Sequence, residues 1–362
     1  MPARVAPVKP AERFYAAMTS NTELHKGGGV ISTEARSTDF DQAAAALGEH
    51  ADNPSAYLAL NGGNDFFTAP GLSGVIAYRA AGRYWVQFGG PFAAEADRAP
   101  LLEAFLRTAA AQRRKVVSVQ LQQSDAELYA GHGFTVNQLG ASYSVELTTF
   151  GLRGKKFVRL RNKVSRAQRA GLLITEIDPA GHAEAIRTID AKWLRSKGRH
   201  VKELEFLVGE LGGRAQQRRR LFLGTIEGTP TCYISYSPAY GSRPGWLHDL
   251  SRRVPDSPPG VLEAINVHAI EQFRQAGAGW LHFGFTPFSG LDPEVEVSSS
   301  SGMVAWFIRF LAKHGDAIYP AKTQVEYKSK WNPGVVLPEY IAFHKGASFG
   351  AIWKILRITK SV

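Results

Sequence analysis

The sequence predicts an α/β fold built from two similar domains, in which mixed sheets are flanked by helices. The chain has 362 residues, of which 44% are hydrophobic, and this is enough for two cores of ordinary size. Both halves combine hairpins with helix-to-strand crossovers, and the second half repeats the order of the first in longer form. We therefore expect a flexible arm over 1–34, domains over 35–150 and 151–345, and a basic amphipathic helix over 346–362.

The first half contains the signals of a short α/β domain. Residues 1–34 hold Pro, Lys, Ser and a glycine triplet, which predicts a loosely held arm. A capped helix is expected over 37–51. Apolar residues alternate around an Ala-Gly turn over 75–88, which predicts a hairpin. Residues 99–122 predict a helix that runs into a strand, and residues 125–140 predict a short helix, a glycine break and another strand.

The second half opens with a basic helix and then alternates strands and helices. Apolar periodicities of two and of 3.6 residues distinguish the two kinds of element. The expected strands are 219–228, 229–238, 245–251 and 279–285, and the expected helices are 260–277 and 303–315.

The segment "KKFVRLRNKVSRAQRAG", residues 155–171, has the pattern of an amphipathic helix that ends at Gly171. The cations that share one face are Lys156, Arg159, Lys163 and Arg166. The neighbouring apolar face consists of Phe157, Leu160, Val164 and Ala167. A run of cations is often only a solvated face, but acidic residues normally interrupt such a face because i,i+4 pairs stabilise it. Their absence here favours a polyanionic partner.

The overall charge agrees with an anionic partner. A net charge of +11 and a pI near 9.7 favour encounters with nucleic acid, anionic lipid or phosphorylated small molecules. The single cysteine, Cys232, excludes disulfides within the chain, which is typical of the cytosol. No apolar run approaches the roughly 20 residues that span a bilayer, so we expect a cytoplasmic protein, either free or peripheral to the membrane.

Five segments together resemble a known family over about residues 40 to 345. They are "GVIAYRAAGRYWVQFGGP", "RLRNKVSRAQRAG", "WLHDLSRR", "FGFTPFSGL" and "EYKSKWNP". In their order and spacing they are similar to the cytosolic catalytic domain of bacterial phosphatidylglycerol lysyl- and alanyltransferases. The resemblance implies a tandem-GNAT acyltransferase fold. It also implies transfer of an amino acid from charged tRNA to a lipid head-group hydroxyl.

The identity of the acceptor stays open at this point. Lipid-modifying members usually carry a multi-helix membrane region before this domain, and the sequence has none. Related soluble members aminoacylate small molecules, so a soluble hydroxyl or amine is the second candidate. Because an aminoacyl-tRNA ester is already activated, we expect aminoacyl-tRNA as co-substrate, without a separate cofactor and without a metal.

Asp249 and Arg252 are the candidate catalytic residues. They lie in "WLHDLSRR", at the end of an expected strand, and by resemblance they form the Asp-Leu-x-Arg element of the active site. Asp249 would hold the substrate's α-ammonium group or act as a base, and Arg252 would bind a phosphate or the polarised ester. Without the resemblance, an ordinary ion pair at a strand end would explain both residues.

Two further segments supply candidate substrate-binding residues. In "EYKSKWNP", an extended backbone would set Lys328 and Lys330 on one side, with an anion between them; two solvated lysines are the alternative. In "FGFTPFSGL", Thr286 and Ser289 follow an expected strand, as in the loop of a substrate cleft. An ordinary Pro/Gly turn is the alternative for that loop.

Two other functions compete with aminoacyl transfer. An acyl-CoA-dependent GNAT N-acyltransferase needs backbone N–H groups for the CoA pyrophosphate, and "SRRVPDSPPGVLEAIN" offers prolines and a single glycine at that place. A non-enzymatic, basic RNA-binding protein would explain the basic helix but gives Asp249 and Arg252 no role.

The C-terminal segment "FGAIWKILRITK" forms an amphipathic helix with basic residues outside its apolar face. That face consists of Phe349, Ile352, Trp353 and Leu356. The helix either docks on its own domain or lies on an anionic membrane surface.

Overall fold

The computed structural model describes residues 33–197, 204–314 and 321–361, and residues 1–32 of the expected arm lie outside this part. The first half has the predicted helices and strands, including the hairpin. In chain order they are α2 (Thr33–His50), η1 (Ala56–Leu60), β1 (Asp65–Phe67), β2 (Val75–Ala81), β3 (Tyr84–Phe92), α3 (Glu95–Ala111), β4 (Lys115–Leu121), α4 (Gln123–Gly131) and β5 (Phe134–Glu146).

The second half also has its predicted strands and helices, and in addition a helix over Ala321–Ser329 and a strand over Val335–His344 that were not predicted. Its elements up to β9 are η2 (Lys155–Phe157), α5 (Val158–Arg169), β6 (Leu173–Ile177), η3 (Ala180–His182), α6 (Ala183–Lys197), η4 (Arg214–Arg218), β7 (Arg220–Ile226), β8 (Thr229–Ala239) and β9 (Gly245–Arg253). They are followed by α7 (Val261–Gln275), β10 (Trp280–Pro287), η5 (Pro293–Val295), α8 (Gly302–His314), α9 (Ala321–Ser329), β11 (Val335–His344) and α10 (Phe349–Ile358).

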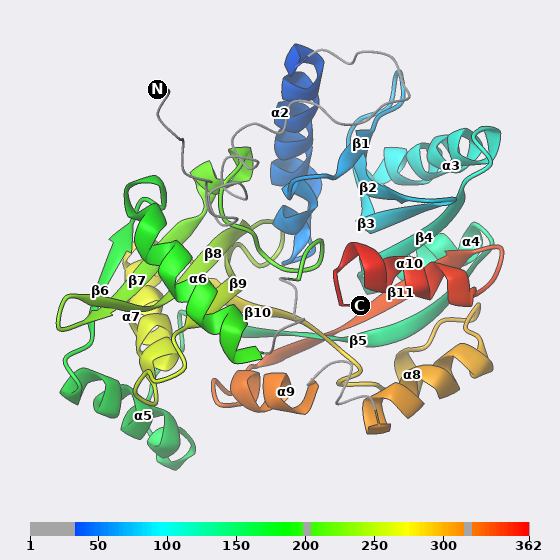
Figure 1. The fold of residues 1–362 in the computed structure, drawn as a ribbon. Coiled ribbons are helices and arrows are strands. Elements are labelled where there is room, and N and C mark those ends of the chain that lie inside the picture. The colour runs from blue at the N-terminus through cyan, green and yellow to red at the C-terminus, as the bar shows by residue number, and fades with distance from the viewer. Residues whose placement is uncertain (1–32, 198–203, 315–320, 362) are drawn as a thin grey trace, which may run out of the picture.

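The described strands form one continuous mixed sheet, with helices on its faces (Figure 1). The strand order is β1-β2-β3-β4-β11-β5-β10-β9-β8-β7-β6. Neighbouring strands are antiparallel except for two parallel pairs, β3–β4 and β9–β10. The predicted α/β class, with mixed sheets flanked by helices, is therefore confirmed.

The expected division at residue 150 does not divide the sheet. Strand β11 comes from the segment assigned to the second domain, yet it lies between β4 and β5 of the first half and pairs with both. The two halves also share a hydrophobic core, in which Leu247 of β9 and Ala351 of α10 join side chains of α2 and β3. The two halves are also joined where residues 280–287 of β10 pair with residues 140–146 of β5.

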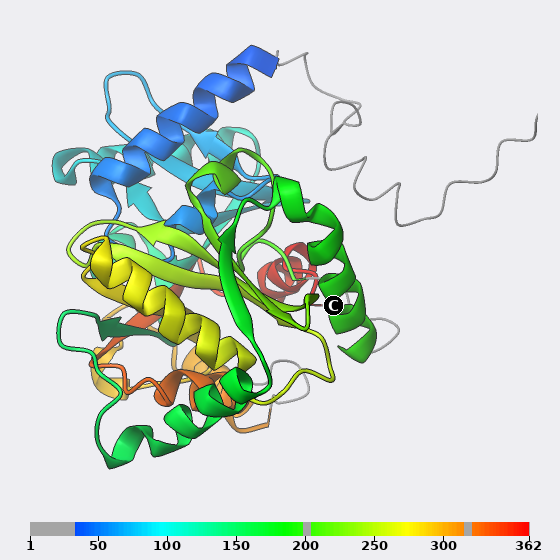
Figure 2. The same ribbon diagram turned by 90° about the vertical axis from the view of Figure 1, so that its left-hand side faces the viewer.

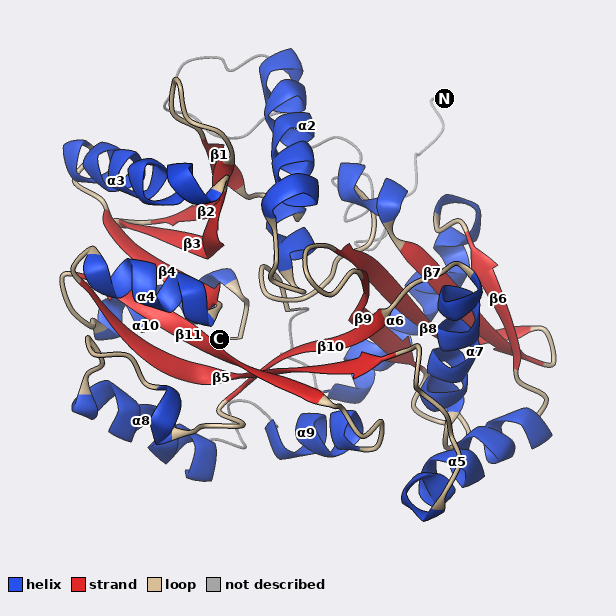
Figure 3. Ribbon diagram, turned by 180° about the vertical axis from the view of Figure 1, so that it is seen from behind, coloured by secondary structure: helices blue, strands red, loops and turns tan. Residues whose placement is uncertain are grey.

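Helices α6 and α7 cover opposite faces of strands β7 to β9 (Figure 2). Ile186 and Ile189 of α6 pack on one face with Leu250. Ile265 and Phe273 of α7 pack on the other face with the apolar residues of α5. Helices α5, α8 and α9 follow one side of the molecule (Figure 3). Side chains of β9 therefore contact α6 or α7 according to the face of the sheet on which they lie.

Candidate functional site

Strands β9 and β10 separate at their carboxyl ends. They pair in parallel at only three positions, from Trp280 opposite Gly245 to His282 opposite Leu247. Beyond these residues, β9 pairs only with β8 and β10 pairs only with β5. Backbone groups that face the gap therefore need partners other than a neighbouring strand. We call this gap the β9–β10 split.

Lys328 occupies the β10 side of the split. Its Nζ donates hydrogen bonds to the carbonyl oxygens of Gly284, at 2.7 Å, and of Phe285, at 3.0 Å. The side chain is buried, and burial lowers the pKa of Lys328 to about 7, although the Glu339 carboxylate opposes this shift. Lys328 thus replaces the missing strand as the partner of two backbone carbonyls.

The expected pairing of Lys328 with Lys330 is wrong, because its premise of an extended backbone is wrong. Lys328 lies in the last turn of α9, and Lys330 lies just beyond the end of that helix. Lys330 Nζ lies 3.4 Å from Glu263 Oε1 on α7, while Lys328 points to β10. The two ammonium groups therefore have separate partners and do not enclose one anion.

Asp249 lies on the β9 side of the split, at a β-bulge. Ser235 of β8 pairs with Leu250 and Tyr236 pairs with His248, so Asp249 is the extra residue on β9. The Ser237 hydroxyl donates a hydrogen bond to Asp249 Oδ2. A bulge interrupts the alternation of side chains between the two faces of a sheet, so the side chains after Asp249 change face.

Arg219 is the charge partner of Asp249. Its Nε lies 3.3 Å from Asp249 Oδ2, and both side chains are fully buried. Burial raises the pKa of Asp249, and the Arg219 guanidinium and the Ser237 hydroxyl oppose that increase. Asp249 Oδ1 has no hydrogen-bond partner of good geometry in the described part of the chain. One carboxylate oxygen is therefore held by Ser237 and Arg219, while the other is buried without such a partner among the described residues.

Arg252 lies on the same face of β9 as Leu250, against α6. Its guanidinium carbon lies 3.9 Å from the ring centre of Trp193, and its Nη1 donates to the Ser251 carbonyl at 3.1 Å. In a regular strand, residues three apart face opposite sides. The bulge at Asp249 removes this alternation, so the structure brings Asp249 and Arg252 to one face of the sheet.

Gly209 covers the Asp249 carboxylate. A Cβ atom at Gly209 would lie 2.5 Å from Asp249 Cγ, which is closer than real contacts allow. The Gly209 N–H also donates to the Asp249 carbonyl at 3.1 Å. The chain can therefore lie over the carboxylate only because residue 209 lacks a side chain.

Thr286 and Ser289 lie near the end of β10, beside the split. Thr286 is fully buried, and its Oγ1 has no hydrogen-bond partner within the described residues. Ser289 Oγ donates to the Thr286 carbonyl at 2.8 Å and accepts from the Tyr143 hydroxyl at 3.3 Å. The Ser289 hydroxyl thus holds the loop in place, while the buried Thr286 hydroxyl has no such partner in this part of the structure.

His248, next to Asp249, has a structural environment on the opposite face. Its Nδ1 lies 3.1 Å from Asn266 Oδ1 on α7, and burial lowers the pKa of His248 to about 4. The imidazole is therefore neutral at pH 7.

Sequence reasoning missed two residues that contribute charge to the site. Arg219 stands in the run "RRRL", which is typical of a solvated surface, and only burial distinguishes it from its neighbours. Glu339 on β11 is fully buried, and neither carboxylate oxygen has a hydrogen bond of good geometry in the described region. Burial raises the pKa of Glu339 to about 7, while the Ser142 hydroxyl and the Lys328 ammonium oppose this shift. A single sequence carries no signal for either residue.

The basic helix forms as predicted, but its cationic face differs in one residue. The expected apolar face is buried against α7, and Gly171, with φ of 78°, closes the helix through hydrogen bonds that a Schellman motif requires. Lys163 is not one of the unpaired cations of this face, because its Nζ lies 3.0 Å from Glu263 Oε1. Lys156, Arg159 and Arg166 are exposed and form no ion pair within the described residues.

Two pockets lie outside the split. A groove of about 430 Å³ runs between α5, β6 and α7 and is lined by Val164, Leu172 and His268, among others. A small cavity of about 20 Å³ lies beneath α8. Neither of these two pockets includes Asp249, Arg252 or Lys328.

The family model for the C-terminal region of phosphatidylglycerol lysyltransferase matches residues 44–343, which include both sides of the split. The chain belongs to this family. Its curated relatives include phosphatidylglycerol lysyltransferase of Bacillus subtilis, which is 25% identical over 258 residues, covering 70% of this chain and 29% of the relative. A lysylphosphatidylglycerol biosynthesis bifunctional protein of Rhodococcus opacus is 25% identical over 78% of this chain and 26% of its own length. The chain thus spans less than a third of the length of these two family members.

Solved structures of the family have the same fold. The C-terminal domain assigned to a lysylphosphatidylglycerol synthetase of Agrobacterium fabrum matches with a TM-score of 0.72 at 22% identity, covering 90% of this chain and 96% of that one. The protein named L-PGS from Bacillus licheniformis matches with a TM-score of 0.71 at 23% identity, covering 88% and 96%. This chain therefore has the overall fold of these two proteins. No helix among the described residues of this family member is long and apolar enough to cross a membrane.

Proposed function

We propose that this protein transfers an amino acid from charged tRNA to a hydroxyl group of phosphatidylglycerol. The observation that carries the proposal is the buried Asp249–Arg219 pair at the β9–β10 split, in which Asp249 Oδ1 has no hydrogen-bond partner of good geometry among the described residues. Membership of the family supports the reaction class, and the exposed cations of α5 support a polyanionic donor. Use of charged tRNA requires the chain to work in the cytoplasm.

The proposed step is an ester exchange. The acceptor oxygen attacks the carbonyl carbon of the aminoacyl ester, its proton is transferred, and the 3′-oxygen of the tRNA leaves with a proton. Asp249 Oδ1 accepts a hydrogen bond from the substrate, either from its α-ammonium group or from the attacking hydroxyl. Arg252, on the same face, stabilises negative charge on the carbonyl or a nearby phosphate. Thr286 Oγ1 offers a further polar contact from the β10 side.

The acyl-CoA alternative is disfavoured by the start of α7. In an acyl-CoA site, the free N–H groups of such a helix start bind the pyrophosphate. Here a Cβ atom at Gly260 would lie 2.1 Å from the Lys163 carbonyl, so α5 is packed directly against this helix start. The first turn of α7 also contains the buried carboxylate of Glu263, which repels an anion. The place that CoA would need is filled.

A two-part assay tests the proposal. The pure protein is mixed with a full set of charged tRNAs, and loss of each aminoacyl ester is followed with and without phosphatidylglycerol vesicles. We expect one or a few esters to disappear faster with the lipid, together with an aminoacylated lipid product. Faster loss with soluble hydroxyl or amine compounds, and none with the lipid, would replace the lipid by a soluble acceptor. Turnover of acetyl-CoA without use of any charged tRNA would overturn the proposal.

A further inference from the structure

Large apolar side chains gather on the outer sides of α8 and α10. Met303, Trp306 and Trp353 are 77%, 62% and 53% exposed, and Phe310 and Phe349 are exposed beside them. The rings of Trp306 and Phe310 stack at 5.7 Å along α8. A contact at 6.2 Å between Phe307 and Phe349 joins α8 to α10. We call these outer sides together the α8–α10 face.

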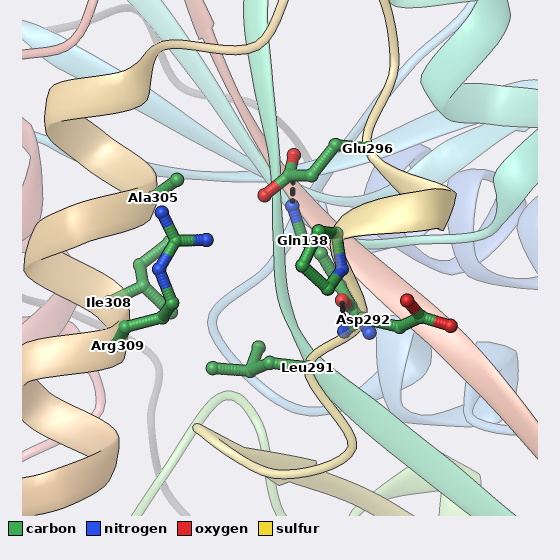
Figure 4. A pocket seen from close by; sticks show the side chains of 8 residues that line it. Gln138, Leu291, Asp292, Glu296, Ala305, Ile308 and Arg309 are labelled. Carbon is green, nitrogen blue, oxygen red and sulfur yellow. Dashed lines mark hydrogen bonds between the residues drawn. The ribbon is translucent and has the colours of Figure 1, made fainter.

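The exposed residues are not needed to attach the two helices. Ala305 and Ile308, on the inner side of α8, face the loop at Leu291 across the small cavity (Figure 4). Ala351 of α10 is buried, and Ile352 packs beside it on the first core. A helix whose inner side is already packed gains nothing for folding from aromatic residues on its outer side. An exposed apolar surface of this kind indicates an interaction site.

The charged side chains of α8 and α10 themselves are all cations. The segments 302–314 and 345–361 contain no aspartate or glutamate. Both carry cations, among which Lys313 on α8 and Arg357 on α10 are exposed. Arg309 is also exposed but lines the small cavity on the inner side of α8 (Figure 4). Tryptophan and phenylalanine next to lysine and arginine are typical of helices that lie in the interface of an anionic bilayer. Another apolar protein surface would not require this excess of cations.

The α8–α10 face is also connected to the split. The chain leaves β10 at Pro287 and reaches α8 through residues 288–301. In that connection, Gln138 of β5 accepts from the Asp292 N–H at 2.7 Å and donates to the Gly290 carbonyl at 2.8 Å. A surface held on α8 is therefore tied to the end of β10, where Thr286 lies.

We infer that the α8–α10 face docks on an anionic phospholipid bilayer with the aromatic side chains inserted at the head-group level. The inference rests on the proposed function only for the purpose of the docking, which is to bring the protein to its lipid acceptor. The docking itself requires neither tRNA nor catalysis. The sequence left two alternatives for the C-terminal helix, docking on the protein or lying on a membrane. In this proposal its inner side docks on the protein, and Phe349 and Trp353 on its outer side meet the membrane.

Vesicle sedimentation tests the inference. The full chain is mixed with vesicles of phosphatidylcholine alone and with vesicles that also contain phosphatidylglycerol. We expect binding to the anionic vesicles that weakens with salt, and weaker binding to the neutral ones. The variant Trp306→Ser/Phe349→Ser/Trp353→Ser should lose at least about tenfold in affinity with an unchanged melting temperature. Leu173→Ser is the matched control, since Leu173 is 68% exposed on β6 at the other end of the sheet.

A second variant tests the charge. Lys313→Gln/Arg357→Gln should reduce the preference for anionic vesicles while binding to neutral vesicles stays the same. Equal vesicle binding by the wild type and the aromatic variant would overturn the inference. The inference would also fail if the wild type were a dimer and the aromatic variant a monomer, because the face would then be a contact between two copies of the chain. Transfer to a water-soluble glycerophosphoglycerol acceptor should be unchanged in both variants. If vesicles bind but no acceptor is aminoacylated, the proposed function fails and the docking stands.

Discussion

Arg219 links the two halves of the molecule through Asp249. Its Nε lies 3.3 Å from Asp249 Oδ2 on β9, and its Nη2 donates to Asn61 Oδ1 of the first half at 2.6 Å. Because all of these groups are buried, the ion pair is strengthened by its surroundings but leaves a costly charge if either partner is removed. Function and stability are therefore coupled at this carboxylate.

Replacing Asp249 should affect both properties. Asp249→Asn should lower transfer at least about a hundredfold and lower the free energy of unfolding by about 3 kcal/mol, because Arg219 is left without its counter-charge. Adding Arg219→Gln should restore part of the stability and none of the transfer. Urea unfolding and initial transfer rates measure the two effects. Normal transfer in Asp249→Asn would remove this carboxylate from the mechanism.

Arg252 should matter for transfer more than for folding. Arg252→Ala removes the guanidinium that lies on Trp193 and should lower transfer about a hundredfold. The lost stacking should cost about 1 kcal/mol of stability. If thermal unfolding changes and the transfer rate does not, Arg252 is a packing residue only.

A methyl group at Gly209 should disturb the cover over Asp249. Gly209→Ala places a Cβ atom 2.5 Å from Asp249 Cγ, so the segment or the carboxylate must move. We expect a lower melting temperature together with slower transfer. Gly151→Ala is the control, because a Cβ atom there meets nothing within 4 Å. Equal behaviour of the two variants would contradict a tight cover.

The buried pair Glu339 and Lys328 predicts a specific pH dependence of stability. Burial raises the pKa of Glu339 from 4.5 to about 7, so between these values the unfolded chain has lost a proton that the folded protein keeps. Glu339 therefore lowers stability as the pH rises through this window. Glu339→Gln should match the wild type near pH 4.5 and become more stable above pH 7.

Lys328 acts at higher pH. Its pKa falls from 10.5 to about 7, so its own contribution should increase stability as the pH rises above 7. Melting curves from pH 4.5 to 10 separate the two residues. If Glu339→Gln is less stable than the wild type at pH 8, the prediction fails. The ionised carboxylate would then be stabilised by its partners by more than burial destabilises it.

The basic helix should control the salt dependence of tRNA binding. Each phosphate contact contributes roughly 0.7 to 0.9 to the slope of log affinity against log salt. Lys156→Gln/Arg159→Gln/Arg166→Gln should flatten this slope by about two units.

Lys163→Gln is the matched control for that experiment. Its ammonium is paired with Glu263, so the change should lower stability and leave the slope unchanged. An unchanged slope in the triple variant would mean that this face only meets solvent.

Local patterns in the sequence were sufficient for much of this structure. Period-two and period-3.6 hydrophobicity predicted the hairpin of β2 and β3, the basic helix and the strands β7 to β10, because these elements are specified by their own residues. The resemblance of quoted motifs indicated the family, and it singled out Asp249 and Arg252. The extended backbone on which the pairing of Lys328 with Lys330 depended is not present, because residues 321–329 form helix α9.

Long-range contacts decided the rest. The position of β11 between β4 and β5, the partner of Asp249, and the capture of Lys163 by Glu263 each join residues far apart in the chain. Burial then sets the chemistry: it separates Arg219 from its solvated neighbours and brings the pKa values of Lys328 and Glu339 together near 7. The sequence by itself determined the elements and the kinds of side chain available, because both are local properties. Only the tertiary structure determined which charges lose their water and which partners they meet, because desolvation depends on everything packed around a group.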